Sequence, residues 1–313
     1  MTAADTHREP GSGGPRGGGG PGGGGPRGGG PRGGGPRSGP GGGGPRGGVP
    51  VLPETGPDPG EPELHILADR DALADAAARL IVDLLVAAVN RRGRAEIALT
   101  GGSTAPAVYR RLIAADLRDQ VPWDRVGLWW GDDRYVPRGH PLSNVTAADE
   151  ILFAREGIRV AAEQIHPFPT GRAMDGGQGA ARCATTYAAE MARTLPFVDG
   201  WPSFDLVLVG IGEDGHLLSV FPGSEALRSD CLALAIPAPV HIEPHVPRVT
   251  LNPAFLGAAG HVVALAAGAT KAGVIARILD GPRDPARLPA TLARRANATW
   301  LLDAAAATGL IDR

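Results

Sequence analysis

The sequence is poor in cysteine, with only Cys183 and Cys231, which lie far apart in the chain. Two distant cysteines do not make a disulfide framework, so we expect core thiols and a reducing, cytoplasmic setting. The chain lacks the apolar core of a signal peptide and any window apolar enough for a membrane span, so no membrane partner is expected. The formal net charge is only −2, which argues against nucleic-acid binding by the folded part of the chain.

The common metal-binding patterns are also missing. There is no His-Glu-x-x-His segment and no paired cysteine motif. His241 and His245 are four residues apart, but neighbouring prolines argue against the helix that would align them as ligands. These prolines are Pro239, Pro244 and Pro247. We therefore expect neither a metal nor a cofactor.

The N-terminal segment consists almost entirely of glycine, proline and arginine between about Gly11 and Gly48. Such a segment has no apolar groups to offset its ordering entropy, so residues 1–60 are predicted to be a disordered tail. Its arginines are not balanced, because no acidic residue lies between Glu9 and Glu54. Two interpretations stay open: a weak arm for nucleic acid or another anionic surface, and a coding extension or misplaced start codon without function.

Residues 61–313 are predicted to form one large domain, in which apolar strands alternate with helices. The first helix is expected to begin at the N-cap Asp71 and to end before Gly93. Helices are expected over residues 71–89, 143–153, 180–193 and 270–279, and a further helix is expected to begin near residue 106. Strands are expected over residues 97–100, 126–130, 204–209, 231–236, 248–251, 261–266 and 299–302. Continuous apolar strands without hairpin signals predict an α/β fold, a doubly wound, mostly parallel sheet with helices on both faces.

The most informative segment is a glycine-rich loop, residues 210–224, directly after the strand that ends at Val209. It brings His216 next to Asp214. Loops at the carboxyl ends of buried strands hold the chemistry of open α/β sheets, and histidine titrates near neutral pH. The loop therefore predicts an enzyme that moves a proton.

A second loop, Gly101-Gly102-Ser103-Thr104, lies between a strand and a helix. Its glycines, its hydroxyls and the helix N-terminus suit a phosphate, although serine and threonine are also common as ordinary helix caps. Arg248 stands at the start of the predicted strand 248–251, and Lys271 stands at the start of the predicted helix 270–279. Both positive side chains suit the same phosphate, unless they are ordinary surface charges.

A third loop, residues 131–137, carries Asp132, Asp133 and Arg134. These side chains either bind sugar hydroxyls or pair with one another, and an acidic doublet in a loop is usually solvated. Ser143 and Asn144 are expected to cap the following helix.

Taken in order, these motifs resemble the 6-phosphogluconolactonase family, within a larger group of sugar-phosphate enzymes that includes glucosamine-6-phosphate deaminase. The resemblance covers essentially all of residues 61–313 and excludes the tail. It rests on residues 100–106, 132–137 with 143–144, 210–216 with 221–223, and 248–250 with Lys271.

The resemblance implies a lactonase catalytic domain. It would hydrolyse 6-phospho-D-glucono-1,5-lactone to 6-phospho-D-gluconate in the oxidative pentose phosphate pathway. Its binding partner would be this small sugar-phosphate lactone, and the protein would be a monomer or a small homo-oligomer. His216 would be the general base, with Asp214 near it to orient its ring or to close the loop as a turn residue. The oxyanion donors would be backbone N–H groups or Arg134. The implied substrate- and phosphate-binding residues are Gly101, Gly102, Ser103, Thr104, Asp132, Arg134, Arg248 and Lys271.

The chain departs from the family in two places. Asp133 stands where the family usually has glutamate, and Leu217 and Leu218 stand where small residues are usual, which narrows the pocket. Deaminases of the wider group carry a glutamate where this chain has Phe221, and an apolar ring cannot shuttle a proton. A non-catalytic sugar-phosphate sensor on the same fold would typically have lost the histidine, which is present here as His216. Lactonase is therefore the favoured interpretation, with deaminase and sensor as alternatives.

Overall fold

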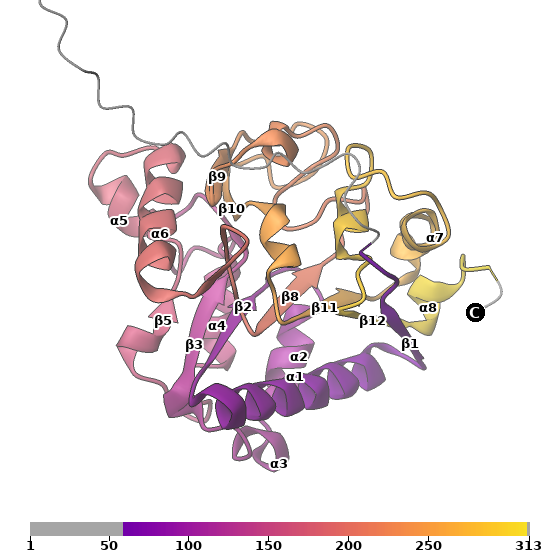
Figure 1. Ribbon diagram of the computed structural model, residues 1–313, viewed down its shortest axis with the longest axis horizontal. Coiled ribbons are helices and arrows are strands. Elements are labelled where there is room, and N and C mark those ends of the chain that lie inside the picture. The colour runs from indigo at the N-terminus through magenta and orange to yellow at the C-terminus, as the bar shows by residue number, and fades with distance from the viewer. Residues whose placement is uncertain (1–58, 312–313) are drawn as a thin grey trace, which may run out of the picture. The chain divides into compact units, whose positions relative to one another are not determined.

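The computed structural model describes residues 59–311 (Figure 1). The predicted tail, residues 1–60, lies outside the described residues except for Pro59 and Gly60. The carbonyl of Pro59 accepts a hydrogen bond from the backbone N–H of Ala296 at 2.8 Å. No helix of the described part is long and apolar enough to cross a membrane.

A seven-stranded sheet forms the centre of the fold, and all of its neighbouring strands pair in parallel. In sheet order the strands are β1 (Glu63–Leu67), β12 (Ala298–Asp303), β11 (His261–Ala266), β8 (Leu206–Gly210), β2 (Ala95–Leu99), β3 (Val126–Trp130) and β5 (Ile165–His166). The predicted doubly wound parallel sheet is confirmed.

The direction of winding reverses between β2 and β8. From β2 the chain moves outward to β3 and β5, then returns to β8 and moves the opposite way to β11 and β12. The carboxyl ends of strands on the two sides of such a reversal leave a crevice in which ligands bind. The fold alone therefore directs attention to the loops that follow β2 and β8.

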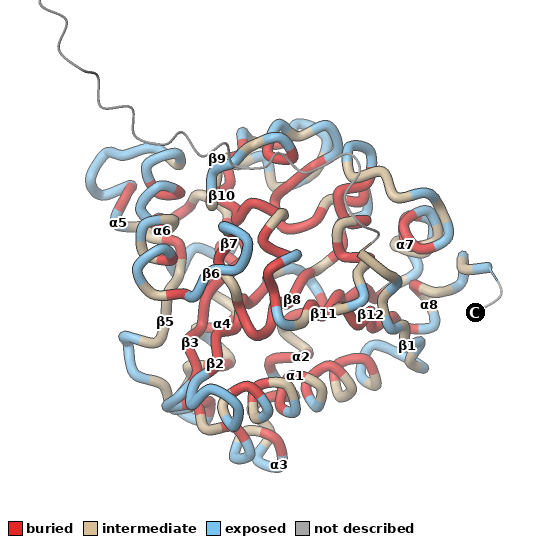
Figure 2. The backbone as a smooth tube through the Cα atoms, viewed as in Figure 1, coloured by how far each residue is buried: buried red, intermediate tan, exposed pale blue. Residues whose placement is uncertain are grey.

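Burial follows from the apolar strand sequences. Every residue of β2, β3 and β12 is buried, whereas the edge strand β1 is largely exposed or half-buried (Figure 2). Strands covered on both faces need continuous apolar runs, and such runs predict these strands from the sequence. The sequence does not predict β1, because its charged and histidine side chains interrupt the apolar run that indicates a buried strand. Such side chains are accepted in β1 because it lies at the edge of the sheet.

Helices cover the sheet from both sides, with α1, α2 and α3 below it and α6 and α7 above it in Figure 1. The long helix α1 (Arg70–Arg92) packs against β2, β8 and β12. Its N-cap is Asp69, which accepts a hydrogen bond from the N–H of Ala72, so the predicted cap Asp71 is wrong by two residues. The other helices are α2 (Ala105–Leu112), α3 (Ala115–Arg118), α4 (Asn144–Ile151), α5 (Thr170–Asp175), α6 (Ala180–Thr194), α7 (Ala272–Leu279) and α8 (Ala304–Ala307).

A small antiparallel sheet lies beside the carboxyl ends of the central strands. It consists of β4 (Asp132–Arg134), β10 (Arg248–Leu251) and β9 (Ala233–Ile236), with β10 in the middle. The residues of β4 were expected to be part of a loop, and they form a strand because β10 supplies backbone partners for them. A two-stranded hairpin, β6 (Phe197–Val198) with β7 (Trp201–Pro202), is too short for a sequence pattern and was also missed.

The two cysteines differ in environment. Cys183 lies in α6 and is buried, as expected, whereas Cys231 is exposed. The expectation that both thiols belong to the core is therefore wrong for Cys231, which precedes β9 rather than lying within it.

Candidate active site

A cavity of about 260 Å³ lies at the reversal point of the sheet, between the loops that follow β2 and β8. The small sheet and the segment after β11 complete its walls. All of the predicted site residues except Asp214 line this cavity. They are Gly101, Gly102, Ser103, Thr104, Asp132, Arg134, His216, Arg248 and Lys271.

Asp214 lies behind His216 and contacts it twice. Its Oδ1 accepts a hydrogen bond from the backbone N–H of His216 at 3.0 Å and lies 2.6 Å from Nδ1 of the same residue. Asp214 therefore both closes the loop as a turn residue and orients the imidazole, which were the two roles left open by the sequence.

The protonation of the pair follows from its surroundings. Burial tends to raise the pKa of Asp214, but hydrogen bonds from His216 and His241 outweigh it and hold that pKa well below its usual range. An ionised carboxylate only accepts hydrogen bonds, so Nδ1 of His216 carries the ring proton. In a ring that carries its proton on Nδ1 alone, the free electron pair is on Nε2, which suits a general base.

The loop after β8 can hold this pair because of its glycines. The N–H of Gly212 donates to the carbonyl of His216, and the N–H of Gly215 donates to the carbonyl of Gly212, both at 3.0 Å. A Cβ atom on Gly212 would overlap the imidazole of His216. Glycine therefore lets the ring lie directly on the backbone of its own loop.

The loop after β2 has the features of an anion site. Gly102 has a φ of +83°, and Thr104 is the N-cap residue of α2. The Thr104 side chain makes no capping hydrogen bond, and its buried Oγ1 has no partner among the described residues. The ordinary cap role therefore does not apply to Thr104, because its hydroxyl bonds to no N–H group of the first turn of α2.

Two arginines lie opposite each other at the cavity wall, because Arg134 of β4 pairs in register with Arg248 of β10. Like charges on directly opposite residues are destabilising. Arg248 is 3 % exposed, and its guanidinium donates a hydrogen bond to the carbonyl of Pro244 at 3.2 Å. The Nε atoms of both arginines are buried without a partner within residues 59–311.

Lys271 adds a third cation to the same cavity. Burial lowers the pKa of Lys271 and of Arg248, and the nearby Arg134 lowers that of Arg248 further. Within the described part of the chain neither residue forms an ion pair with a carboxylate. Buried cations without a counter-ion are costly, and an anionic ligand would stabilise all three.

The acidic doublet is buried rather than solvated, contrary to expectation. Asp133 accepts backbone N–H bonds from Asn144 at 2.7 Å and from Arg134 at 2.8 Å, and a hydroxyl bond from Ser143 at 2.8 Å. Burial raises its pKa to about 7. Asp133 thus ties the start of α4 to β4, and its neighbour Asp132 faces the cavity.

Ser143 is the N-cap of α4, as expected, but Asn144 has a further place. It lines the cavity, accepts a hydrogen bond from the guanidinium of Arg134 and donates to the carbonyl of Asp132 at 2.9 Å. The sequence indicated only a helix start here. Asn144 holds Arg134 in position, and this depends on the pairing of β4 that the sequence did not reveal.

The loop between β9 and β10, residues 237–247, contributes residues that sequence reasoning missed. Ile242 and Glu243 line the cavity, and Nε2 of His241 lies 2.8 Å from Oδ2 of Asp214. The sequence suggests a role for His241 only as a metal ligand. The described residues contain no cluster of three or more His, Cys, Asp or Glu side chains arranged to hold a metal.

Of the two leucines that depart from the family, only Leu218 lines the cavity. Leu217 is fully buried. Leu218 has a φ of +56°, in the left-handed region that bulky side chains rarely adopt. Of these two leucines, Leu218 is therefore the one whose side chain can narrow the pocket.

A larger concavity, about 620 Å³, lies elsewhere, beside Trp123. Its lining mixes arginines with acids, and Arg118 is already paired with Asp119 at 2.7 Å. It contains no histidine and no glycine-rich loop at a strand end. We assign the active site to the smaller cavity, because a histidine and unpaired cations face the same space there.

Comparisons with known proteins identify the family of this chain. A family model described as glucosamine-6-phosphate isomerases/6-phosphogluconolactonase matches residues 68–301. A 6-phosphogluconolactonase of Streptomyces coelicolor is 36% identical over 256 residues, which cover 80% of this chain and 95% of that protein. A 6-phosphogluconolactonase of Mycobacterium tuberculosis is 35% identical over 79% of this chain and 98% of its own. The solved 6-phosphogluconolactonase of Trypanosoma brucei has a TM-score of 0.69 at 30% identity, covering 80% of this chain and 99% of that one.

Proposed function

Because the chain belongs to the family of glucosamine-6-phosphate isomerases and 6-phosphogluconolactonases, we propose that it hydrolyses 6-phospho-D-glucono-1,5-lactone to 6-phospho-D-gluconate. It is an enzyme of the 6-phosphogluconolactonase type, a carboxylic ester hydrolase. The observation that carries the proposal is one cavity lined both by the His216 imidazole and by the unpaired cations Arg134, Arg248 and Lys271. A base at one wall and an anion site at another match a lactone with a distant phosphate.

Hydrolysis of a lactone needs an activated water, stabilisation of the oxyanion and a proton for the leaving ring oxygen. Nε2 of His216 takes a proton from the water as the oxygen attacks C1. The carboxylate of Asp214, 2.6 Å from Nδ1, stabilises the imidazolium that forms. His216 then returns the proton to the ring oxygen as the C1–O bond breaks.

The phosphate binds between the loop after β2 and the basic side chains. The backbone of Gly102, the hydroxyls of Ser103 and Thr104, and the charges of Arg248 and Lys271 hold it. Arg134 helps to hold the remainder of the substrate. This assignment is supported by the unsatisfied Oγ1 of Thr104 and by the missing counter-ion of Arg248. We place the reaction in the oxidative pentose phosphate pathway of the cytoplasm.

The deaminase alternative is less well supported. Deaminases of the wider family carry a glutamate where this chain has Phe221, and the Phe221 ring packs 4.9 Å from the ring of His216. An apolar ring beside the base cannot carry a proton to or from the substrate. The position that would supply isomerase chemistry is therefore filled by packing.

The test is hydrolysis of freshly generated 6-phosphoglucono-δ-lactone, with the spontaneous opening subtracted and the unphosphorylated lactone run in parallel. The wild type should accelerate the phosphorylated substrate selectively. His216→Ala should lower kcat about 10²- to 10⁴-fold with little change in phosphate affinity.

His166→Ala is the matched control, because His166 also contacts a carboxylate, Glu190, at 2.7 Å but does not line the cavity. Its turnover per folded molecule should match the wild type. A His216→Ala enzyme with near wild-type turnover would contradict the assigned base. If the wild type accelerates neither lactone, the proposed function is wrong and glucosamine 6-phosphate becomes the next substrate to assay.

A further inference from the structure

The carboxylate of Asp214 contacts two imidazoles, one through each oxygen. Oδ1 lies 2.6 Å from Nδ1 of His216, and Oδ2 lies 2.8 Å from Nε2 of His241. The two histidines come from different parts of the fold, the loop after β8 and the loop between β9 and β10. Asp214 therefore joins the proposed base to a loop that reaches it only through tertiary structure.

The two oxygens of Asp214 are held by different residues. Oδ1 takes both contacts from His216, the ring and the backbone N–H, whereas the contact to Oδ2 comes from His241. Because an ionised carboxylate only accepts hydrogen bonds, Nε2 of His241 must carry its proton. This second hydrogen bond prevents the carboxylate group from rotating away from the His216 ring.

The position of His241 is itself supported by packing. The Phe221 ring meets the His241 ring edge-on at 5.5 Å and also contacts the His216 ring at 4.9 Å. The loop is tied at two further points, from His245 Nδ1 to the Pro239 carbonyl at 2.7 Å and from Arg248 to the Pro244 carbonyl at 3.2 Å. His241 is therefore held in place rather than reaching Asp214 as a free surface side chain.

His241 does not line the cavity, although its neighbours Ile242 and Glu243 do, and its side chain is 48% exposed. It touches Asp214 and Phe221 rather than the space for the substrate. His241 therefore acts on the reaction indirectly, and its hydrogen bond to the carboxylate of Asp214 is its polar link to His216, beside the packing through Phe221.

We propose that His241 is a positioning residue for the hydrolysis, which fixes the Asp214 carboxylate so that Oδ1 stays on Nδ1 of His216. This inference rests on the proposed function. The aligned carboxylate matters most when the imidazolium forms, so the loss of His241 affects the transition state more than substrate binding. Of the proposed phosphate-binding residues, Arg248 contacts this loop at the carbonyl of Pro244 rather than at His241, so its phosphate contact is kept.

The test compares two substitutions in the full-length chain. His241→Ala should lower kcat about tenfold, the value of one hydrogen bond to a charged group, and leave KM within about twofold. His241→Gln should recover most of kcat, because its amide N–H group can donate to the same oxygen. A purely structural role would not give this split between kcat and KM or this rescue.

His245→Ala is the control within the same loop. His245 contacts the Pro239 carbonyl and lies near Glu243, but it has no contact with Asp214. Its kcat should fall much less than that of His241→Ala, because the contact of Arg248 with the loop and the packing of Phe221 on His241 remain. Equal loss of kcat in His241→Ala and His245→Ala, or in His241→Ala and His241→Gln, would overturn the inference, because loop integrity would then explain the effect.

Proton NMR gives a readout that does not depend on lactone turnover. The Nδ1 proton of His216, hydrogen-bonded to a carboxylate, should resonate far downfield, should shift or broaden in His241→Ala and should be retained in His241→Gln. Inactivity of the wild type on the lactone would contradict the proposed function. The Nδ1 proton signal of His216 would still test whether His241 holds the carboxylate of Asp214 in position. Wild-type kcat together with an unchanged signal in His241→Ala would contradict the role of His241.

Discussion

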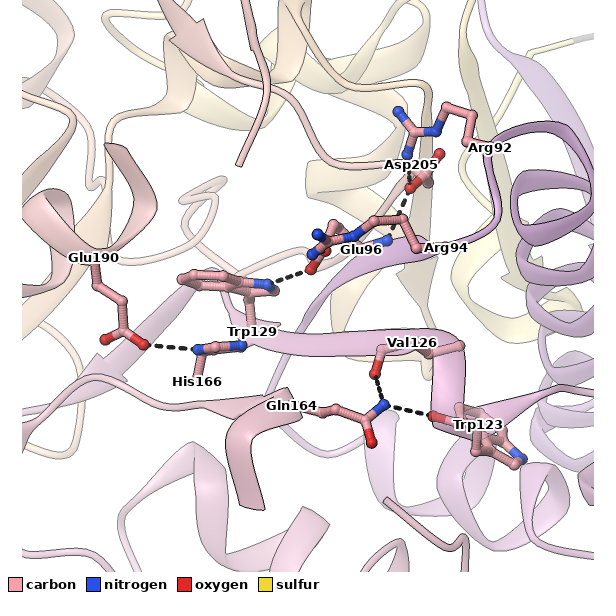
Figure 3. A network of polar contacts seen from close by, with 10 residues as sticks. All are labelled: Arg92, Arg94, Glu96, Trp123, Val126, Trp129, Gln164, His166, Glu190 and Asp205. Carbon is pink, nitrogen blue, oxygen red and sulfur yellow. Dashed lines mark hydrogen bonds and ion pairs between the residues drawn. The ribbon is translucent and has the colours of Figure 1, made fainter. Parts of the chain in front are cut away.

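Two histidine–carboxylate pairs of nearly the same length lie in very different surroundings. His216 Nδ1 lies 2.6 Å from Asp214 at the carboxyl ends of the central strands, and His166 Nδ1 lies 2.7 Å from Glu190 beside β3 (Figure 3). Geometry within the pair does not separate a candidate active site from a structural contact. The difference lies in whether the polar groups around each pair are satisfied.

Around His166 the polar groups are paired with one another. Its ring stacks on Trp129 at 4.0 Å, and the Trp129 indole donates to the buried Glu96 at 2.7 Å, which also pairs with Arg94 (Figure 3). Asp205 accepts the backbone N–H of Glu96 at 2.8 Å and pairs with an arginine of α1. None of the residues in this network has a buried side-chain polar atom without a partner.

Around His216 the polar groups are left open. Thr104 Oγ1 and the Nε atoms of Arg134 and Arg248 are buried without partners, and all three residues line the same cavity. Unsatisfied buried groups are costly and are retained where a ligand completes them. The contrast teaches that the open site is recognised by missing partners rather than by the histidine pair itself.

The first prediction concerns Arg248→Ala, which removes one unpaired cation from the open site. KM for the phosphorylated lactone should rise about 10- to 100-fold with kcat changed only a few-fold, because phosphate binding is shared by the ground and transition states. Steady-state kinetics on both lactones checks this, since KM for the unphosphorylated lactone should stay the same. Arg94→Ala, which removes a paired arginine from the closed network, should leave both constants unchanged. A loss of turnover with constant KM would count against the phosphate role of Arg248.

The second prediction concerns the closed network. Glu96→Ala leaves the buried indole N–H of Trp129 without an acceptor and should lower the free energy of unfolding by about 2 kcal/mol. Urea unfolding measures the loss, and Glu96→Gln should lose less, because its amide oxygen still accepts the bond. Turnover per folded molecule should be unchanged in both. A large fall in kcat would mean that the two regions are coupled across the sheet.

The third prediction concerns Asp133, the buried carboxyl group beside the open site. Burial raises its pKa to about 7, so the folded state holds this proton when the unfolded chain has already released it. The contribution to stability is present below about pH 4 and is lost as pH rises toward 7, at up to about 1.4 kcal/mol per pH unit. Asp133→Asn should flatten this part of the curve of unfolding free energy against pH. Equal slopes in the two proteins would show that Asp133 is ionised throughout.

How far the sequence predicts this architecture depends on whether a feature is local. The bounds of β3, β10 and β11 follow from apolar runs, and the glycine loops that reach the cavity follow from short motifs. The strand β4 and the edge strand β1 do not, because their pairing partners are far away in the chain and their sequences are polar.

The same reason explains the site residues that were missed. In the sequence Asn144 indicates a helix start, and His241 is a histidine between prolines. Asn144 reaches the site through its contact with Asp132 of β4, and His241 reaches it through the β9–β10 loop, so both depend on the tertiary structure. The burial of Asp133 also depends on that closure, which a search for acidic doublets cannot detect. Local motifs therefore indicate the chemistry that we propose, while the groups that hold those residues in position become visible only in the tertiary structure.

The smallest predicted effect separates the open site from ordinary core packing. Leu218 lines the cavity with a φ of +56°, whereas the neighbouring Leu217 is buried without a positive φ, and none of the residues in the closed network of Figure 3 has one. Alanine normally stabilises a chain more than glycine, but at positive φ the order reverses. Leu218→Gly should therefore be more stable than Leu218→Ala by about 1 kcal/mol in urea unfolding, and Leu217→Gly should be less stable than Leu217→Ala. If alanine is the more stable substitution at both positions, then the backbone at Leu218 is not strained, and the cavity differs from the core only in its unpaired polar groups.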